Sequence, residues 1–310
     1  MKLESQKKSM SVWWSKNLPY LLMALPGIVL LFIFNYLPMF GTVMAFKDYN
    51  YAEGFFASRW VGFQNFTYFF TSNDAVRVLR NTILYNIGLM MLVNVFGGII
   101  IALLMYEVHS RLAMKVYQTA LLLPTFVSWV IVAYIGLILL NPDHGIVNII
   151  MHWFGSEGIN WYAEPEYWPF ILAAFDFWKN AGMASLYFYA ALLNIDVCLF
   201  EAAALDGAGR LKQVLHISIP EMLPMTCVII ITRMGGILGG EMGMYYQMTM
   251  DSGSLYPTTD VLATYLYRGL ATGDFSTTAA VGLFQSVVGL ILVYFSNTVI
   301  KKISPQNAMF

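Results

Sequence analysis

The stretch that decides the fold, residues 83–106, reads ILYNIGLMMLVNVFGGIIIALLMY and contains no charged residue. A transmembrane helix needs about 20 consecutive, mainly apolar residues, because the hydrocarbon layer of a bilayer is about 30 Å thick. In lipid the backbone has no water to bond to, so a single spanning stretch must be a helix. The period-two alternation of a membrane strand is not seen in this stretch.

Five further stretches of the chain are long and apolar enough to span. They cover residues 18–46, 116–140, 168–193, 222–247 and 277–300. In the first, Pro26, Asn35 and Pro38 predict either a kink or a bent extension that leaves the membrane. The stretch 222–247, fifth along the chain when residues 83–106 are counted, holds Arg233, Glu241 and several glycines, and is unusually polar for a span. The sequence therefore predicts an all-α polytopic membrane protein with about six transmembrane helices.

The composition agrees with a membrane protein and argues against other classes. Of the 310 residues, 58% are hydrophobic and 11% are charged, whereas a soluble domain carries about 25% charged residues. A formal net charge of −1 gives no reason to expect a nucleic-acid partner. Cys198 and Cys227 belong to no ligand motif, so we expect neither a metal site nor a structural disulfide.

We expect the N-terminal apolar segment to be retained as a span. Lysines precede a run that starts near Leu18, as in a signal peptide, but the run continues to about Phe46 and no cleavage pattern closes it. No internal repeat or soluble domain is visible in the sequence. We therefore predict one membrane domain over residues 18–303, between short cytoplasmic tails at 1–17 and 304–310.

Basic residues in the connecting segments favour an N-in and C-in orientation. With both termini in the cytoplasm, ten basic residues lie inside and five outside. The outer connection 141–167 has no lysine or arginine. The outer segment 47–80 fits this orientation less well, because it carries four of the five outer basic residues. There Phe63, Phe66 and Phe70 recur at helical spacing ahead of two arginines, which predicts an amphipathic helix at the outer interface.

The connection between the fourth and fifth stretches is suited to two short helices. It reads EAAALDGAGRLKQVLHISIP over residues 201–220. Asp196 is a favourable N-cap for the first helix, and Gly207 accepts the left-handed geometry that ends it. A second helix is expected across Arg210–Ile217. The small side chains would allow another protein to approach closely, and a plain connecting loop is the alternative.

This spacing resembles the "EAA" loop of permease subunits from bacterial ABC importers. The pattern consists of Glu-Ala-Ala at 201–203, a glycine at 207 and Ile-x-Ile-Pro at 217–220. The family usually has leucine at the position of Ile219, and proline at that of Val197. Other similar segments are Trp60–Phe66, Asn81-Thr82, Thr259–Tyr265 and Ser276–Lys302. They extend the resemblance over nearly the whole chain and indicate the carbohydrate-uptake, maltose-type permeases, in the subgroup for oligosaccharides and polysaccharide fragments.

The resemblance implies a transport role with several partners. The chain would form half of the translocation pathway for an oligosaccharide, in an ATP-driven importer of the bacterial cell membrane. It would pair with a second, homologous permease, with two ABC ATPase subunits and with an extracytoplasmic solute-binding protein. The ATPases would use ATP and Mg²⁺, and this chain would bind no cofactor. The alternative is a permease of the same family for a non-sugar solute such as glycerol phosphate.

The resemblance also assigns roles within the loop at 194–220. Glu201 and Arg210 would be polar contacts to the ATPase, and Gly207 the turn. The full coupling set is Glu201, Ala202, Ala203, Asp206, Gly207, Gly209, Arg210, Ile217 and Pro220. The sequence has no GxxxxGK[ST], GxSxG, HExxH or CxxC, so we expect no catalytic residues and no metal in this chain. The EAA loop also argues against a membrane-embedded enzyme or a receptor-like scaffold.

Polar residues inside the spans are the candidates for contact with substrate, because a charge in lipid is costly. Asp176 and Lys179 share a helix face, and either neutralise each other or line a polar wall. Arg233 and Glu241 lie about two turns apart, and either bridge helices or recognise a sugar. The candidates for the substrate pathway are Asp176, Lys179, Asn180, Arg233, Glu241, Tyr245, Tyr246 and Gln247.

Overall fold

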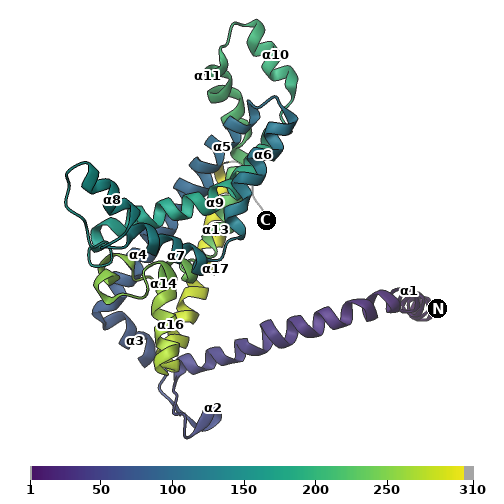
Figure 1. Ribbon diagram of the computed structural model, residues 1–310. Helices are drawn as coiled ribbons and strands as arrows, with labels where there is room; N and C mark the ends of the chain where they lie inside the picture. The colour runs from purple at the N-terminus through teal and green to yellow at the C-terminus, as the bar shows by residue number, and fades with distance from the viewer. Residues whose placement is uncertain (1, 304–310) are drawn as a thin grey trace. The chain divides into compact units, whose positions relative to one another are not determined.

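The structure is a computed structural model that describes residues 2–303, with side chains from Asn17 onward. Its contacts divide the chain into two compact units, Met1–Thr67 with Phe275–Leu283 and Tyr68–Asp274 with Phe284–Phe310. Both units consist almost entirely of helices (Figure 1). The predicted tail at 1–17 is helical from Lys2 onward, and the predicted tail at 304–310 lies outside the described residues.

The first unit contains the N-terminal span. Helix α1, Lys2–Leu31, continues as the π-helix η1, Phe32–Tyr36, and as the 3-10 helix η2, Leu37–Phe46. Pro38 stands at the start of η2 and has no N–H to extend the hydrogen-bond ladder of α1, which explains the change of helix type. At the break that the sequence predicted in this span, the helix changes from α to π and then to 3-10 geometry and does not end.

A small hairpin follows the N-terminal span. Strands β1, Lys47–Asp48, and β2, Arg59–Trp60, pair antiparallel on either side of helix α2, Gly54–Ala57. The Lys47 ammonium is buried and donates a hydrogen bond of 2.8 Å to the carbonyl of Phe55. A buried cation needs such acceptors, so this contact holds α2 against the hairpin.

The second unit contains the remaining helical bundle. Its elements, together with the two helices α3 and α17 that it shares with the first unit, are α3 Gln64–Thr71, α4 Asn73–Leu89, η3 Met90–Gly97, α5 Gly98–Tyr106, α6 Arg111–Leu122, η4 Leu123–Phe126, α7 Trp129–Leu140, α8 Ile146–Trp153, η5 Pro165–Tyr167, α9 Trp168–Leu193, α10 Val197–Leu205, α11 Arg210–Gln213, η6 Val214–Ser218, α12 Ile219–Glu221, α13 Leu223–Met234, α14 Met242–Met248, η7 Gly253–Leu255, α15 Tyr256–Thr259, α16 Leu262–Thr272 and α17 Phe275–Ile303.

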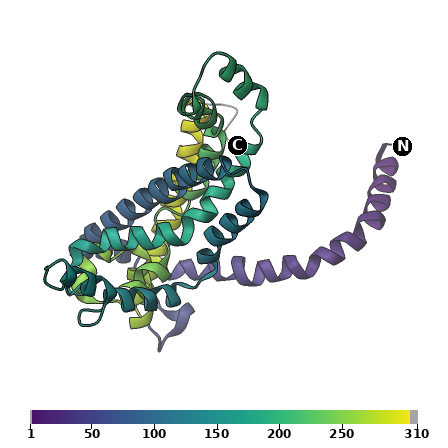
Figure 2. The ribbon, with the colours of Figure 1, turned by 45° about the horizontal axis from the view of Figure 1, so that its top comes forward.

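Helices α5 and α9 run side by side through this unit (Figure 2). Two glycines at the start of this contact allow the close approach. A Cβ on Gly98 would lie 2.8 Å from the ring of Phe188, and one on Gly97 would lie 2.7 Å from the ring of Phe177. These aromatic rings therefore occupy the space that larger residues would need.

The helical membrane fold predicted from the sequence is confirmed, and three of its candidate spans are pairs of helices that meet at a bend. Asn17–Phe46, Asn73–Tyr106 and Phe275–Lys302 are each long and apolar enough to cross a membrane. Three bent helix pairs raise the number of spans to six if each pair counts once. They are Arg111–Phe126 with Trp129–Leu140 at 95°, Pro165–Leu193 with Val197–Leu205 at 71°, and Arg210–Glu221 with Leu223–Met234 at 49°.

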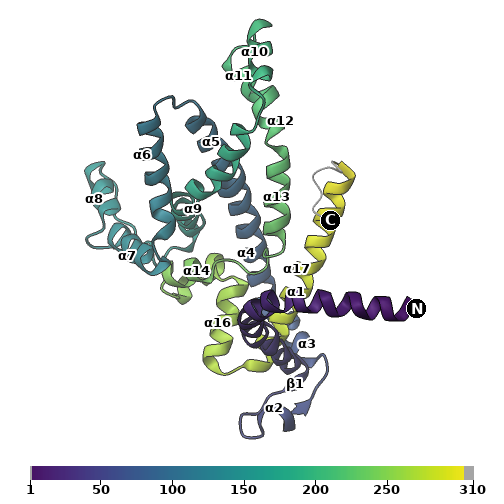
Figure 3. The same ribbon diagram turned by 90° about the vertical axis from the view of Figure 1, so that its right-hand side faces the viewer.

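The fifth predicted span, 222–247, is wrong as one continuous helix. Helix α13 ends at Met234, and α14 begins only at Met242 (Figure 3). The intervening residues include four glycines, each of which weakens a helix by about 1 kcal/mol relative to alanine. Gly240 has a φ of +75°, which lies in the left-handed region and ends any helical continuation.

The outer amphipathic segment also differs from the prediction. Helix α3 ends at Thr71, and α4 begins at Asn73, so Arg77 and Arg80 belong to the second span. The separation has a local cause, because the Ser72 hydroxyl caps α4 by accepting a hydrogen bond from the N–H of Ala75.

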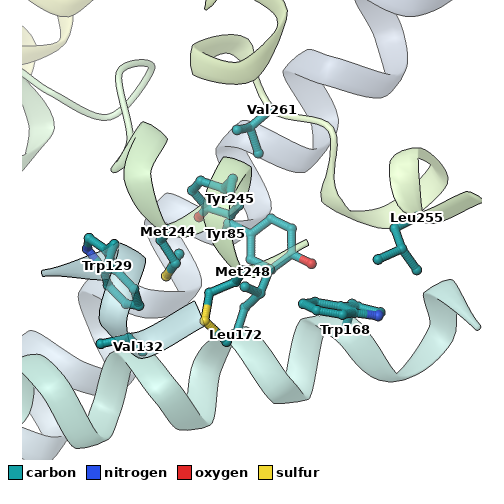
Figure 4. Close-up of a cluster of buried hydrophobic side chains, with 10 residues drawn as sticks. All are labelled: Tyr85, Trp129, Val132, Trp168, Leu172, Met244, Tyr245, Met248, Leu255 and Val261. Atoms are coloured by element: carbon teal, nitrogen blue, oxygen red, sulfur yellow. The ribbon is translucent and has the colours of Figure 1, made fainter. Parts of the chain in front are cut away.

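A largely aromatic core holds one part of the second unit together. Figure 4 shows its members, which are Tyr85, Trp129, Val132, Trp168, Leu172, Met244, Tyr245, Met248, Leu255 and Val261. The rings of Tyr85 and Tyr245 meet edge to face with their centroids 5.2 Å apart. Helices α4, α7, α9 and α14 therefore share one packed centre, which fixes the short helix α14 after the break.

Asp260 is the centre of an ion-pair cluster that joins helices α4 and α16. Its buried carboxylate accepts hydrogen bonds from Arg77, at 2.9 Å, and from Arg268. Arg268 also contacts Asp251 at 3.1 Å and lies 4.3 Å from the ring centroid of Tyr256. Burial acts to lower the pKa of Arg268, but the hydrogen bond and charge of Asp260 outweigh it and raise the pKa.

We predict that Asp260→Asn lowers the free energy of unfolding by about 3 kcal/mol. This is the lower end of the range for a broken buried pair, because both arginines remain partly exposed. Thermal unfolding of the purified protein in detergent measures the loss. The matched control is Asp143→Asn, an exposed carboxylate that should leave the transition unchanged. Equal transitions for the two variants would contradict a structural role for the cluster.

Candidate functional site

A polar cavity lies inside the second unit at the break between α13 and α14. It has a volume of about 600 Å³ and is walled by α4, η3, α9, α13 and α14. We call it the polar cavity. Its lining side chains with hydrogen-bonding groups are Asn86, Asn94, Asp176, Asn180, Tyr187, Thr232, Arg233, Glu241 and Tyr245. So many polar groups at membrane depth indicate a path or a binding site for a polar solute.

The break itself forms one wall of the polar cavity. Backbone groups that leave the helical ladder in a membrane need other partners or a water-filled cavity. Asn86 supplies one partner, because its side-chain amide donates to the carbonyl of Ile237 inside the break. Gly236, Ile237 and Gly240 line the cavity directly. The non-helical backbone therefore lies where the polar cavity and the Asn86 side chain can satisfy its polar groups.

Five of the eight predicted substrate-pathway residues line the polar cavity. They are Asp176, Asn180, Arg233, Glu241 and Tyr245. The structure brings these residues together from helices α9, α13 and α14 and from the break. The sequence interpretation grouped them only within single helices.

The other three predicted residues do not line the polar cavity. Lys179 donates a hydrogen bond of 2.8 Å to the carbonyl of Thr125, and its ammonium lies 5.5 Å from the ring centroid of Trp129. Tyr246 packs against Tyr267, with ring centroids 4.7 Å apart. Gln247 is absent from the lining as well.

The two suggested intrahelical or interhelical ion pairs are not formed among the described residues. Asp176 accepts a hydrogen bond of 2.7 Å from Asn180, one turn along the helix, while Lys179 points elsewhere. Arg233 donates a hydrogen bond of 3.0 Å to the side-chain oxygen of Asn94. Amides, not opposite charges, therefore hold Asp176 and Arg233 at the cavity wall.

The sequence interpretation missed Asn86 and Asn94. Both lie in the stretch that we quoted first, eight residues apart in a run that is otherwise apolar. The same spacing singled out Arg233 and Glu241, so it was an available signal. The sequence did not show that the fifth span is broken. Two uncharged amides in the second span therefore gave no reason to expect that they bind the fifth span.

The loop at 194–220, which we call the coupling loop, forms a helical hairpin that protrudes from the end of the second unit (Figures 1 and 3). Helix α10 is capped as predicted, because the Asp196 carboxylate accepts a hydrogen bond of 2.9 Å from the N–H of Cys198. This bond stabilises the charged carboxylate and lowers the pKa of Asp196. The predicted end of α10 is also confirmed, since Gly207 has a φ of +77°. The bond from the N–H of Ala208 to the carbonyl of Ala203 completes the C-cap.

The second half of the coupling loop is less regular than predicted. Helix α11 covers Arg210–Gln213 and then widens into the π-helix η6 at Val214–Ser218. Pro220, near the start of α12, has no N–H for the preceding turn, which is consistent with the wider pitch.

The predicted coupling residues fall into an exposed group and an anchoring group. Glu201, Asp206 and Arg210 are exposed, as are the glycines of the turn. Ile217 is partly buried and packs against the core formed by Ala102, Phe188, Leu192, Ile195 and Met222. The structure also exposes Leu205 and Leu211, 90% and 72% accessible, which the sequence interpretation did not include. Two exposed leucines on a protruding hairpin indicate a surface that another protein covers.

A polar cavity in a helical membrane bundle and a protruding hairpin with exposed leucines are features of a membrane transport protein. Residues 94–304 match the family model described as "Binding-protein-dependent transport system inner membrane component". The chain belongs to this family, and it is a multi-pass membrane protein.

Among similar proteins is the polygalacturonan/rhamnogalacturonan transport system permease protein YteP of Bacillus subtilis (strain 168), which is 36% identical over 92% of this chain and 88% of its own length. A solved structure of a bacterial ABC transporter involved in the import of the acidic polysaccharide alginate matches with a TM-score of 0.87 and 32% identity. The match covers 96% of this chain and 99% of that one. A second alginate transporter structure, in complex with an alginate pentasaccharide-bound periplasmic protein, matches with a TM-score of 0.82 and 32% identity, over 94% and 96% of the two chains.

We predict that Asp196→Ala loosens the first turn of α10. The N–H of Cys198 then loses its acceptor, whereas Asp196→Asn keeps a side-chain oxygen in the same place. A nitroxide attached to Cys198, in a Cys227→Ser background, reports the motion of this turn by electron paramagnetic resonance. The alanine variant should show a more mobile label at neutral pH and the asparagine variant an unchanged one. Identical spectra for all three proteins would show that the cap does not hold α10.

Proposed function

We propose that the chain is the permease subunit that forms half of the translocation pathway for an oligosaccharide in an ATP-driven importer. The observation that carries this proposal is the polar cavity at the broken fifth span. Its volume of about 600 Å³ lies within the range of about 300–1,000 Å³ that is typical of ligand sites. The likeness to saccharide permeases, stated above, supports the same assignment.

The chemistry of the lining suits a saccharide. Sugar hydroxyls both donate and accept hydrogen bonds, and the side chains of Asn86, Asn94 and Asn180 do the same. Tyr187 and Tyr245 add aromatic rings at the same wall. The Tyr245 hydroxyl is buried and has no hydrogen-bond partner within the described part of the chain. A solute hydroxyl that entered the cavity would find acceptors and donors in several directions.

The chain depends on partners for energy and for the rest of the pathway. We propose that ATP and Mg²⁺ are used by two ABC ATPase subunits that bind the coupling loop, while this chain binds no cofactor and catalyses no reaction. An extracytoplasmic binding protein would deliver the solute, as in the alginate transporter complex. A second, homologous permease would complete the cavity.

Force would reach the polar cavity through continuous backbone. The coupling loop leads through η6 and α12 directly into α13, with a bend of 49°. Helix α13 carries Thr232 and Arg233 into the cavity wall. The anchoring of Ile217 against the bundle core keeps the loop and α13 together as they move. Closure of the ATPases would therefore shift the wall at Arg233, in the manner of a rigid-body switch.

We predict that Gly207→Asp abolishes ATP-driven uptake while the protein still inserts. The substitution adds bulk and a negative charge to a small-residue turn that already carries Asp206, and it strains a φ of +77°. Gly155→Asp is the matched control, because Gly155 has a φ of +78°, equally open surroundings and a place on the other side of the predicted membrane. Uptake of labelled oligosaccharides is measured in cells lacking the native chain and carrying each variant.

The control should transport like the unmodified chain, and both variants should be found in the membrane fraction in equal amounts. Normal uptake by the Gly207→Asp variant would contradict docking through the coupling loop. Co-purification of the ATPase with the control, but not with the Gly207→Asp variant, is expected in the same membranes.

A further inference from the structure

The polar cavity carries more acid than base. Among the residues that line it, Asp176 and Glu241 have carboxyl groups, and Arg233 has the one positive charge. The remaining polar lining residues, which are amides, a threonine and tyrosines, are neutral at physiological pH. The wall that this chain contributes is thus biased toward negative charge.

Among the described residues, no salt bridge joins these charges. Arg233 donates to Asn94, and Asp176 accepts from Asn180, so these two ionisable groups are each held by a neutral amide. None of the ion pairs between described residues includes Asp176, Arg233 or Glu241. Arg233 and Glu241 are also exposed to the cavity. A solute in the polar cavity therefore meets one positive charge, at Arg233, and two carboxyl groups, at Glu241 and Asp176.

We infer that this chain selects neutral oligosaccharides over uronate-containing ones, with Asp176 and Glu241 as the specificity-determining groups. The inference rests on the proposed function. A carboxylate on the sugar would meet like charge at two places on the wall and would be disfavoured there. Neutral sugar hydroxyls can instead donate to the same carboxyl oxygens in charge-assisted hydrogen bonds.

This selectivity separates the chain from similar proteins. YteP is named for polygalacturonan and rhamnogalacturonan, and the matching structures are of alginate transporters, so both are associated with acidic glycans. The cavity wall here has one arginine against two carboxyl groups. In this chain the charge of the wall would act against the passage of an acidic glycan.

The test uses the assembled importer in cells and compares pairs of labelled oligosaccharides. Each pair consists of a neutral oligosaccharide and its counterpart oxidised at C6 to uronates, matched in length and linkage. The unmodified chain should import the neutral member of at least one pair at least tenfold faster than its uronate. Asp176→Asn and Glu241→Gln should each lower this ratio by roughly tenfold, the scale of one removed like charge at close range.

Controls separate charge from folding and from the proposed function. Glu157→Gln makes the same change at an exposed residue of the outer connection and should leave the ratio unchanged. Asp176→Asn preserves an acceptor for Asn180, and Glu241→Gln changes an exposed residue, so neither should prevent assembly. Equal or faster import of the uronate, or a ratio that neither variant changes, overturns the inference alone. Failure to import any saccharide in an ATP-dependent manner overturns the proposed function and the inference together.

Discussion

The backbone's need for hydrogen bonds inside a membrane governs the arrangement of this molecule. An unbroken helix meets that need by itself, and the fifth span does not stay unbroken. Helix α13 ends at Met234, and the glycine-rich segment up to Glu241 leaves the helical ladder. Asn86 binds the carbonyl of Ile237, and Arg233 beside the break binds Asn94. The second span therefore carries the amides that accommodate the break, and the polar cavity forms between them.

The aromatic core holds in place the short helix α14, which follows the break. Helix α14 is only seven residues long and would have little stability alone. Met244, Tyr245 and Met248 place it in the core with Tyr85, Trp129 and Trp168 (Figure 4). One end of the break is thus held rigidly by packing. The other end belongs to α13, which continues to the coupling loop. A cavity wall with one fixed and one movable edge is suited to a transport cycle.

Local signals in the sequence predicted local structure well. The run of uncharged residues at 83–106 predicted a span, Asp196 predicted a helix cap, and Gly207 predicted a left-handed turn, because each depends on neighbouring residues alone. The break in the fifth span was visible as a polar, glycine-rich composition, but its place was not, since it depends on Asn86 across the bundle.

Hydrogen-bond and ion-pair partners that lie far apart in the sequence could not be predicted from it. Lys179 was paired with Asp176 by spacing, yet it binds the carbonyl of Thr125, 54 residues away. Arg77 and Asp260 lie 183 residues apart and gave no sign of one another. The set of residues that line the cavity could not be predicted for the same reason. They come from α4 with its continuation η3, and from α9, α13 and α14, which only the tertiary fold brings together. Roles of the coupling residues remain predictions that rest on the family pattern and on their exposure.

The shift of the cavity wall at Arg233 that we propose would open the polar cavity to alternate sides of the membrane as the partner ATPases use ATP. Thr232 lines the cavity and carries a small side chain, so Thr232→Cys in a background of Cys198→Ser and Cys227→Ser places one thiol at the wall. Membrane-impermeant thiol reagents are then added to one face of vesicles that contain the assembled importer, with and without ATP trapped by vanadate. The account predicts labelling from the cytoplasmic face without nucleotide and from the opposite face in the trapped state. Labelling from the same face in both states would contradict it.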